Sequence, residues 1–143
     1  MKMAWERAEE LPAFANVEEA TSALIAEKDS ILGAFLANPP AGMQLDLSPE
    51  SLKAVEAWYL TTEHRAPPVR ALGFYFGEVL CRNAGFAWIV EPYFLDNSRY
   101  EIGVRKGLVT LMLTKGVNRV LTGNKRMQSL YRDFKQYQSV TSS

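Results

Sequence analysis

The sequence predicts an α+β fold, with about four helices packed on a small antiparallel sheet. Two patterns indicate it: several segments carry apolar residues at helical spacing, and residues 86–94 are rich in the aromatic and β-branched residues that strands favour. The chain has 143 residues, of which 48% are hydrophobic, and this suits one domain with its own core. We therefore expect a single domain over residues 1–143, with 1–15 and 139–143 loosely ordered.

The first helix is expected over residues 17–37. Asn16 stands three residues before Glu19, which is a variant of the capping box, and an asparagine side chain can accept a backbone N–H of the first turn. Two prolines follow Asn38 and should end the helix, because proline disfavours helical conformation in the residue before it.

A second helix is expected to follow Ser48, its N-cap, and to end near residue 62. Pro49 suits the first turn because proline holds φ near the helical value. Lys53, Glu56 and Glu63 are expected to face outward, away from the apolar side of this helix.

The most apolar run of helix length, residues 69–84, is expected to form a central helix. Its apolar residues occupy several faces, so other elements should enclose it. Gly85 can take the left-handed conformation that closes a helix. Gly77 costs the helix about 1 kcal/mol relative to alanine, so we expect another element or an aromatic side chain to approach closely there. Cys81 should be buried and inert in this helix.

Residues 86–94 should form one strand and residues 100–104 the returning strand, with a turn at 96–98 between them. Pro92 is expected to mark a sheet edge or a bulge. Residues 108–121 fit both a strand and a helix, and we favour a strand as far as Thr114 followed by a short helix.

The last segment is expected to form an amphipathic helix. Its apolar stripe comprises Met127, Leu130, Tyr131, Phe134 and Tyr137. The other side is basic, a mixture that nucleic-acid-binding helices also show. We favour an ordinary packed helix, because the aromatic residues lie on the stripe that core packing requires, and a nucleic-acid partner is not expected.

The net charge is zero, but the charges are unevenly distributed. Residues 1–95 hold 7 Lys/Arg and 13 Asp/Glu, whereas residues 96–143 hold 9 and 3. Attraction between two parts of one domain is the simplest explanation. The alternative is an acidic binding surface near the N-terminus, for which Glu18, Glu19 and Glu27 are the candidates.

No apolar run approaches the ~20 residues that cross a bilayer, and the acidic N-terminus has no apolar stretch of a secretory signal. We therefore expect a cytoplasmic protein that does not contact a membrane. No glycine-rich phosphate loop, nucleophile motif or metal-ligand spacing occurs in the sequence. No catalytic residue, metal or cofactor is expected.

The densest polar group is Tyr75, Glu78 and Arg82 on the expected central helix. The spacing favours an ion pair between Glu78 and Arg82 and a hydrogen bond from the tyrosine, both of which are structural roles. The alternative is that a raised pKa makes Glu78 an acid.

The run YFGEVL at residues 75–80, followed by Gly85 and Trp88, resembles a group of small bacterial proteins of unknown function. Those proteins carry a Y-x-G-E-V-L helix, then a glycine and a tryptophan that opens a strand, and some of them look like immunity proteins encoded beside toxins. The resemblance covers about residues 45–104 and implies binding of a partner protein without catalysis.

The sequence thus predicts a non-catalytic, cytoplasmic protein-binding domain, an immunity or accessory protein of a toxin–antitoxin system. The expected partner is another protein, with a toxin as one candidate. The candidate binding residues are Tyr75, Glu78, Arg82, Trp88, Glu18, Glu19 and Glu27. The alternative is a small-ligand-binding protein or enzyme that uses Glu78 and Tyr75 in an aromatic pocket.

Overall fold

The structure is a computed structural model, and it describes residues 11–61, 69–113 and 130–141. Its elements in chain order are α2 (Val17–Ala37), the 3₁₀ turn η2 (Pro40–Gly42), α3 (Ser51–Thr61), α4 (Val69–Asn83), β1 (Ala87–Tyr93), β2 (Asp96–Lys106), β3 (Val109–Met112) and α6 (Leu130–Gln138). The strands form one antiparallel sheet in the order β1-β2-β3. The described residues confirm the predicted α+β fold, with four α-helices and a three-stranded sheet.

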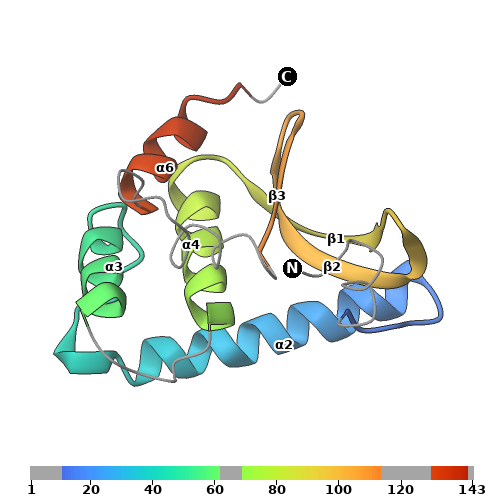
Figure 1. The fold of residues 1–143 in the computed structure, drawn as a ribbon, viewed down its shortest axis with the longest axis horizontal. Helices are drawn as coiled ribbons and strands as arrows, with labels where there is room; N and C mark the ends of the chain where they lie inside the picture. Colours follow the sequence, from blue (N-terminus) through green and yellow to red (C-terminus); the bar gives the residue numbers. More distant parts are fainter. Residues whose placement is uncertain (1–10, 62–68, 114–129, 142–143) are drawn as a thin grey trace.

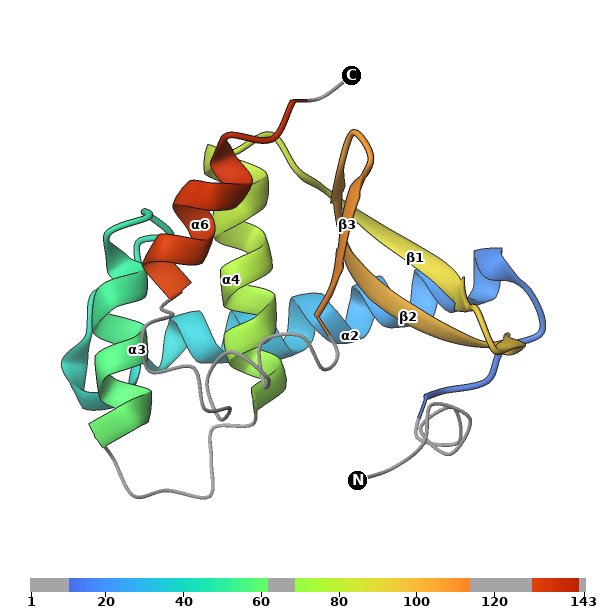
Figure 2. The ribbon, with the colours of Figure 1, turned by 45° about the horizontal axis from the view of Figure 1, so that its top comes forward.

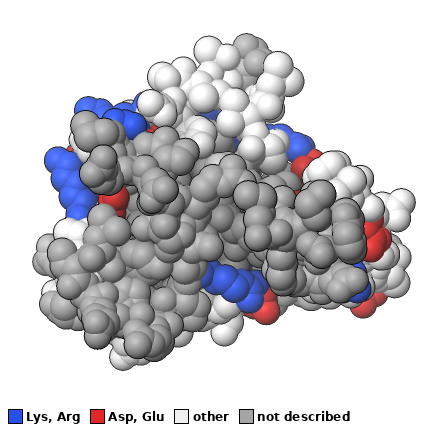
Figure 3. Space-filling view, viewed as in Figure 1, with Lys and Arg blue, Asp and Glu red and all other residues white. Residues whose placement is uncertain are grey.

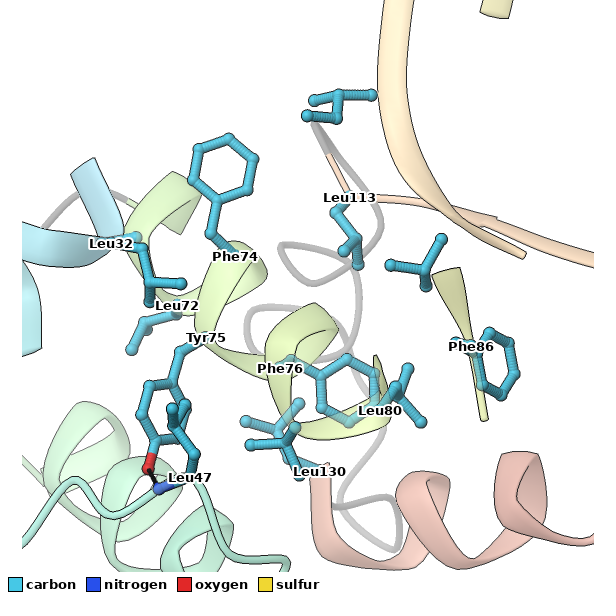
Figure 4. Packing of buried hydrophobic residues seen from close by; sticks show 14 of the residues in the cluster. Leu32, Leu47, Leu72, Phe74, Tyr75, Phe76, Leu80, Phe86, Leu113 and Leu130 are labelled. Atoms are coloured by element: carbon cyan, nitrogen blue, oxygen red, sulfur yellow. Dashed lines mark hydrogen bonds between the residues drawn. The ribbon is translucent and has the colours of Figure 1, made fainter. Parts of the chain in front are cut away.

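Helix α4 lies at the centre of the molecule (Figure 1, Figure 2). Helices α3 and α6 lie on one side of it and the sheet on the other, while the long helix α2 runs past both. Figure 4 shows residues of the core around α4, with Leu32 of α2 on one side and Leu130 of α6 on another. The side chains of α4 with no exposed surface are Leu72, Phe74, Tyr75, Val79 and Leu80. This confirms the predicted central helix, enclosed on several sides.

Helix α2 has the bounds that its capping residues predict. The side-chain oxygen of Asn16 accepts a hydrogen bond from the N–H of Glu19 at 2.8 Å. At the other end, the N–H of Asn38 donates to the carbonyl of Ala34. The buried residues of α2 are Ala20, Leu24, Lys28, Leu32 and Phe35. A lysine therefore lies on the stripe that faces the core.

Helix α3 is capped by Ser48, as predicted, but begins at Ser51. The N–H of Ser51 donates to the Ser48 hydroxyl oxygen at 3.2 Å, and that of Leu52 donates to the carbonyl of Pro49. The latter bond has the three-residue spacing of a 3₁₀ turn, so the chain enters α3 through a turn that is tighter than an α-helix. Glu56, which was expected to face outward, is only 8% exposed. That prediction is wrong because α6, distant in the sequence, packs on this side of α3.

Two glycines shape α4 as the sequence predicts. Gly85 has φ +81°, and the N–H of Phe86 donates to a carbonyl six residues earlier, which closes the helix. At Gly77, a Cβ atom would lie 2.6 Å from the Trp88 ring and would also clash with the side chain of Leu113. The expected close approach of an aromatic side chain is therefore confirmed.

The turn between β1 and β2 consists of Phe94 and Leu95, so the predicted turn at 96–98 is wrong. The carboxylate of Asp96 does accept hydrogen bonds from the backbone N–H of Ser98 at 3.0 Å and from its hydroxyl at 2.6 Å. These bonds lie within β2 because Asp96 already pairs with Tyr93 across the turn. Asp96 and Ser98 thus form hydrogen bonds of the kind that turns contain, but they form them inside β2, and the turn itself lies at Phe94 and Leu95.

The strands are otherwise close to prediction. The register shifts between Pro92 and Tyr93 on an edge strand of the described sheet, as expected for Pro92. Strand β2 is longer than predicted because it has partners along its length: β3 pairs with residues 103–106, and Ala13 forms a bridge with Arg99. Part of the segment that was expected to be loosely ordered therefore contacts the sheet. Strand β3 confirms the strand interpretation of its residues.

Two expected helices fall partly or wholly outside the described residues, and so does the outward orientation expected for Glu63. The short helix expected after residue 114 lies there, as does the N-terminal part of the last helix with Met127. In the described part of that helix, α6, Leu130 and Phe134 are buried, as the apolar stripe predicts. Among the described helices, none is long and apolar enough to cross a membrane.

Candidate functional site

Tyr75 is a structural link between α4 and the start of α3. Its side chain is fully buried, and its hydroxyl accepts a hydrogen bond from the N–H of Leu47 at 3.0 Å (Figure 4). The same hydroxyl bonds the Ser51 hydroxyl at 2.7 Å. Burial raises the pKa of Tyr75, although these two hydrogen bonds act in the opposite direction. The expected tyrosine hydrogen bond therefore exists, but its partners lie near α3 and not at Glu78.

The hydrogen bond to Tyr75 stabilises an unusual backbone conformation at Leu47. Leu47 has φ +62°, in the left-handed region that costs a non-glycine residue roughly 1–2 kcal/mol. Its N–H is bound by Tyr75, and its carbonyl accepts a hydrogen bond at 2.9 Å from the side-chain amide of Asn83. Both partners belong to α4, so the central helix holds this turn at two points.

Glu78 is held by two hydrogen bonds, one on each carboxylate oxygen. The indole N–H of Trp88 donates to one oxygen at 2.9 Å, and the Nε of Arg82 donates to the other at 2.9 Å. Burial acts to raise the pKa of Glu78, but these hydrogen bonds and the charges of Arg82 and Lys28 outweigh it and lower the pKa. Glu78 is therefore ionised at neutral pH, and the raised-pKa alternative is wrong.

Trp88 lies where α2, α4 and β1 meet. Its ring makes an edge-to-face contact with Phe74 at 6.1 Å between centroids. The ammonium of Lys28 lies 4.7 Å from the centre of the Trp88 ring, and it also forms an ion pair with Asp29 at 2.7 Å. We call Lys28, Glu78, Arg82 and Trp88 the Trp88 cluster. This cluster connects α2, α4 and β1, and each of its polar groups already interacts with another group inside the fold.

Sequence reasoning missed Lys28 although a signal was present. Lys28 is eight residues after Ala20 and four before Leu32, which places it on the buried stripe of α2. A charged residue at such a position needs a partner, since an unpaired buried charge is costly. Its charge partner is the adjacent Asp29, whereas its ring contact, Trp88, lies in another element and cannot be deduced from helical spacing.

A metal-ligand group and a reactive cysteine are two other features that could carry chemistry. Within the described ranges, no group of three or more His, Cys, Asp and Glu residues could hold a metal ion. Cys81 is half-buried and not fully buried as expected. Burial, together with the charge of Glu78, raises the pKa of its thiol to about 12, so the thiolate is rare at neutral pH.

The three acidic candidates on α2 do not form one group. Glu18 and Glu19 are exposed in the first turn, where a negative charge is favourable to the helix. Glu27 forms an ion pair with Arg70 of α4. Since each helical residue advances about 1.5 Å, Glu27 lies about 12–14 Å farther along α2. The structure therefore leaves Glu18 and Glu19 as the solvent-facing pair and gives Glu27 a structural contact.

Glu56 is a buried carboxylate that was expected to face outward. Its carboxylate accepts a hydrogen bond at 2.7 Å from the N–H of Leu130, the first residue of α6. A residue of α3 thereby caps a different helix. Burial raises the pKa of Glu56, as does the nearby charge of Asp133, while the bond to Leu130 lowers it.

Residues 69–138 match the model of a protein family described as uncharacterised protein YwmA. The match begins at α4 and includes Glu78, Arg82 and Trp88, but it covers just under half of the chain and leaves out α2 and α3. No curated protein and no solved structure gave a match. The match is thus to a family whose description names no activity.

Proposed function

We propose that this protein is a cytoplasmic domain that acts by binding another protein, without catalysis. The observation that carries the proposal is a division of roles among its polar residues. Tyr75, Glu78 and Trp88 satisfy one another or the backbone inside the fold, whereas Glu18 and Glu19 face solvent. These hydrogen bonds give Glu78 and Tyr75 structural roles, so neither side chain requires a catalytic explanation.

The exposed acidic pair favours a partner with a basic surface. Figure 3 shows acidic side chains beside uncharged ones at the right-hand end of the molecule, and Figure 1 places the first turn of α2 at that end. Opposite charges on two proteins speed their encounter more than they strengthen the final complex. With the resemblance to immunity-like bacterial proteins, this supports an immunity or accessory role. A nuclease toxin is then one candidate partner.

The test begins with capture of the full-length chain's partner from the source cell, followed by its identification and purification. Association is then measured with purified proteins for the wild type and for Glu18→Lys/Glu19→Lys. We expect the association rate of the wild type to fall markedly between ~50 and ~500 mM salt, since the Debye length shrinks from about 14 to about 4 Å. The double variant should associate slowly at both salt concentrations.

The matched control is Glu50→Lys, which reverses an exposed charge just before α3. It changes the same kind of position, near a helix N-terminus, but the helix is α3, which lies at the other end of the molecule from the first turn of α2 (Figure 1). We leave Glu27 unchanged because its reversal would break the ion pair with Arg70. Equal association rates for both variants and the wild type would refute the acidic surface. Failure to find any specific partner would refute the binding function itself.

A further inference from the structure

The turn between β1 and β2 presents two large apolar side chains to solvent. Phe94 is 80% exposed and Leu95 is 48% exposed. Turns of this kind are usually made of Gly, Asn, Asp or Ser, so the conformation does not require a phenylalanine and a leucine. An exposed aromatic ring on a protruding turn is the kind of side chain that anchors protein interfaces. We call Phe94 and Leu95 the hairpin tip.

The hairpin tip rests on a base that is packed and hydrogen-bonded. Tyr93 is 8% exposed, packs with Leu11 in a small apolar cluster, and contacts the Phe94 ring at 5.1 Å between centroids. Arg99 donates to the carbonyl of Leu11 at 2.7 Å and thereby ties the chain before α2 to β2. A side chain that is already held in place loses less entropy on binding, which favours affinity.

Acidic side chains lie at the same end of the molecule as the hairpin tip. The N–H of Phe14 donates to the carbonyl of Ser98 at 3.1 Å, so the chain enters α2 from beside the start of β2. Figure 1 and Figure 2 accordingly show the first turn of α2 and the β1–β2 turn at one end. That first turn carries Glu18 and Glu19, and Val17 beside them is 39% exposed.

We infer that the hairpin tip is the anchor of the partner-binding surface, and that it enters an apolar pocket bordered by Lys and Arg side chains on a partner protein. The inference rests on the proposed function and names the contact that holds the complex. The acidic side chains of α2 meet the basic border of the pocket and govern association. The hairpin tip fills the pocket and governs dissociation.

The second hairpin offers a matched comparison. Leu108 is 95% exposed between β2 and β3, so it equals Phe94 as an exposed apolar side chain on a turn. Two basic residues, Arg105 and Lys106, precede it in the strand that leads into this turn. A partner with a basic border is therefore expected to accept the first hairpin and to reject the second.

The first experiment places a photo-crosslinking residue, benzoylphenylalanine, at position 94 or at position 108 of the full-length chain in the source cell. The cross-linked protein is identified by mass spectrometry and purified. Its complex with the wild type is then compared with those of Phe94→Ala, Leu95→Ser and Leu108→Ala. We expect cross-linking from position 94 and about 30-fold weaker binding for Phe94→Ala through faster dissociation, as for a typical interface anchor. Leu108→Ala should bind like the wild type.

Three results would overturn the inference. If the purified partner binds Phe94→Ala as tightly as the wild type, the tip is not the anchor, although the proposed function stands. If neither position cross-links a protein and none co-purifies, the proposed function fails as well. If light scattering shows a dimer of the wild type that Phe94→Ala abolishes, the tip binds a second copy of this chain. The urea midpoints of all variants serve as the folding control.

Discussion

At the scale of single residues, Gly77 shows how a locally unfavourable choice is offset by packing. Glycine inside a helix costs about 0.5–1 kcal/mol relative to alanine. In α4 the absence of a side chain at Gly77 permits contact with Trp88, because a Cβ there would lie 2.6 Å from the indole ring. The same indole binds Glu78 and faces Lys28, so one absent side chain allows the whole Trp88 cluster to form.

This account predicts opposite effects for two helical glycines. Gly77→Ala should lower the free energy of unfolding by about 1–3 kcal/mol, because the added methyl group overpacks the contact with Trp88. Gly33→Ala, on α2, should raise it by about 0.5–1 kcal/mol, since no atom beyond the adjoining turns of its own helix lies within 4 Å of a Cβ there. Urea unfolding of the two variants measures both changes. A Gly77→Ala protein as stable as the wild type would refute the close approach.

Other single residues explain why the site could be predicted only in part. The pair of Glu78 and Arg82 follows from helical spacing, and it forms as predicted. The partners of Tyr75, by contrast, include the N–H of Leu47, whose left-handed backbone has no signal in its own sequence. Leucine is not a residue that favours this conformation, so only the three-dimensional contact with α4 accounts for it.

At the scale of elements, prediction succeeded where the signal is local. The ends of α2 follow from Asn16 and from the prolines after Asn38, and the end of α4 follows from Gly85. It failed where a distant element decides. Glu56 faces inward because α6 covers α3, and the N–H that it binds is 74 residues away in the sequence.

The contact between α3 and α6 gives a prediction at this scale. Glu56→Ala should lower the free energy of unfolding by about 1–3 kcal/mol, because it leaves the buried N–H of Leu130 without its acceptor. Glu56→Gln should be much milder, since its amide oxygen can accept the same hydrogen bond. The stability of the three proteins is compared by urea unfolding at several pH values.

The pH dependence separates charge from hydrogen bonding. The pKa of folded Glu56 is raised above its ordinary value of 4.5, chiefly by burial, so folding favours the protonated form. Its contribution to stability is present below pH 4.5 and is lost as the pH rises through the folded pKa. Glu56→Gln lacks this loss, so its stability relative to the wild type should improve as the pH rises from 4.5 towards 7. A constant difference over that range would contradict the raised pKa.

At the scale of the whole molecule, the uneven charge has two explanations: attraction between the two parts of the chain, or an acidic binding surface. The ion pairs help to distinguish them. Glu27 pairs with Arg70 and Glu78 pairs with Arg82, and all four residues belong to the acidic part of the chain, residues 1–95. The acidic part thus neutralises some of its own charge. The pair of Glu91 and Arg105 does join the two parts, across β1 and β2.

If attraction between the two parts held the fold together, salt would weaken the folded state strongly. We predict instead that raising the salt concentration from ~50 to ~500 mM changes the free energy of unfolding by less than about 1 kcal/mol. Each exposed ion pair contributes only about 0.2–1 kcal/mol, and the core around α4 is apolar. Urea is the proper denaturant because guanidinium chloride is itself a salt.

Association with a basic partner should slow over the same range of salt concentration, because the encounter of the two proteins depends on long-range charge. A loss of several kcal/mol of stability in high salt would assign the acidic residues to the fold, and Glu18 and Glu19 would then need no partner.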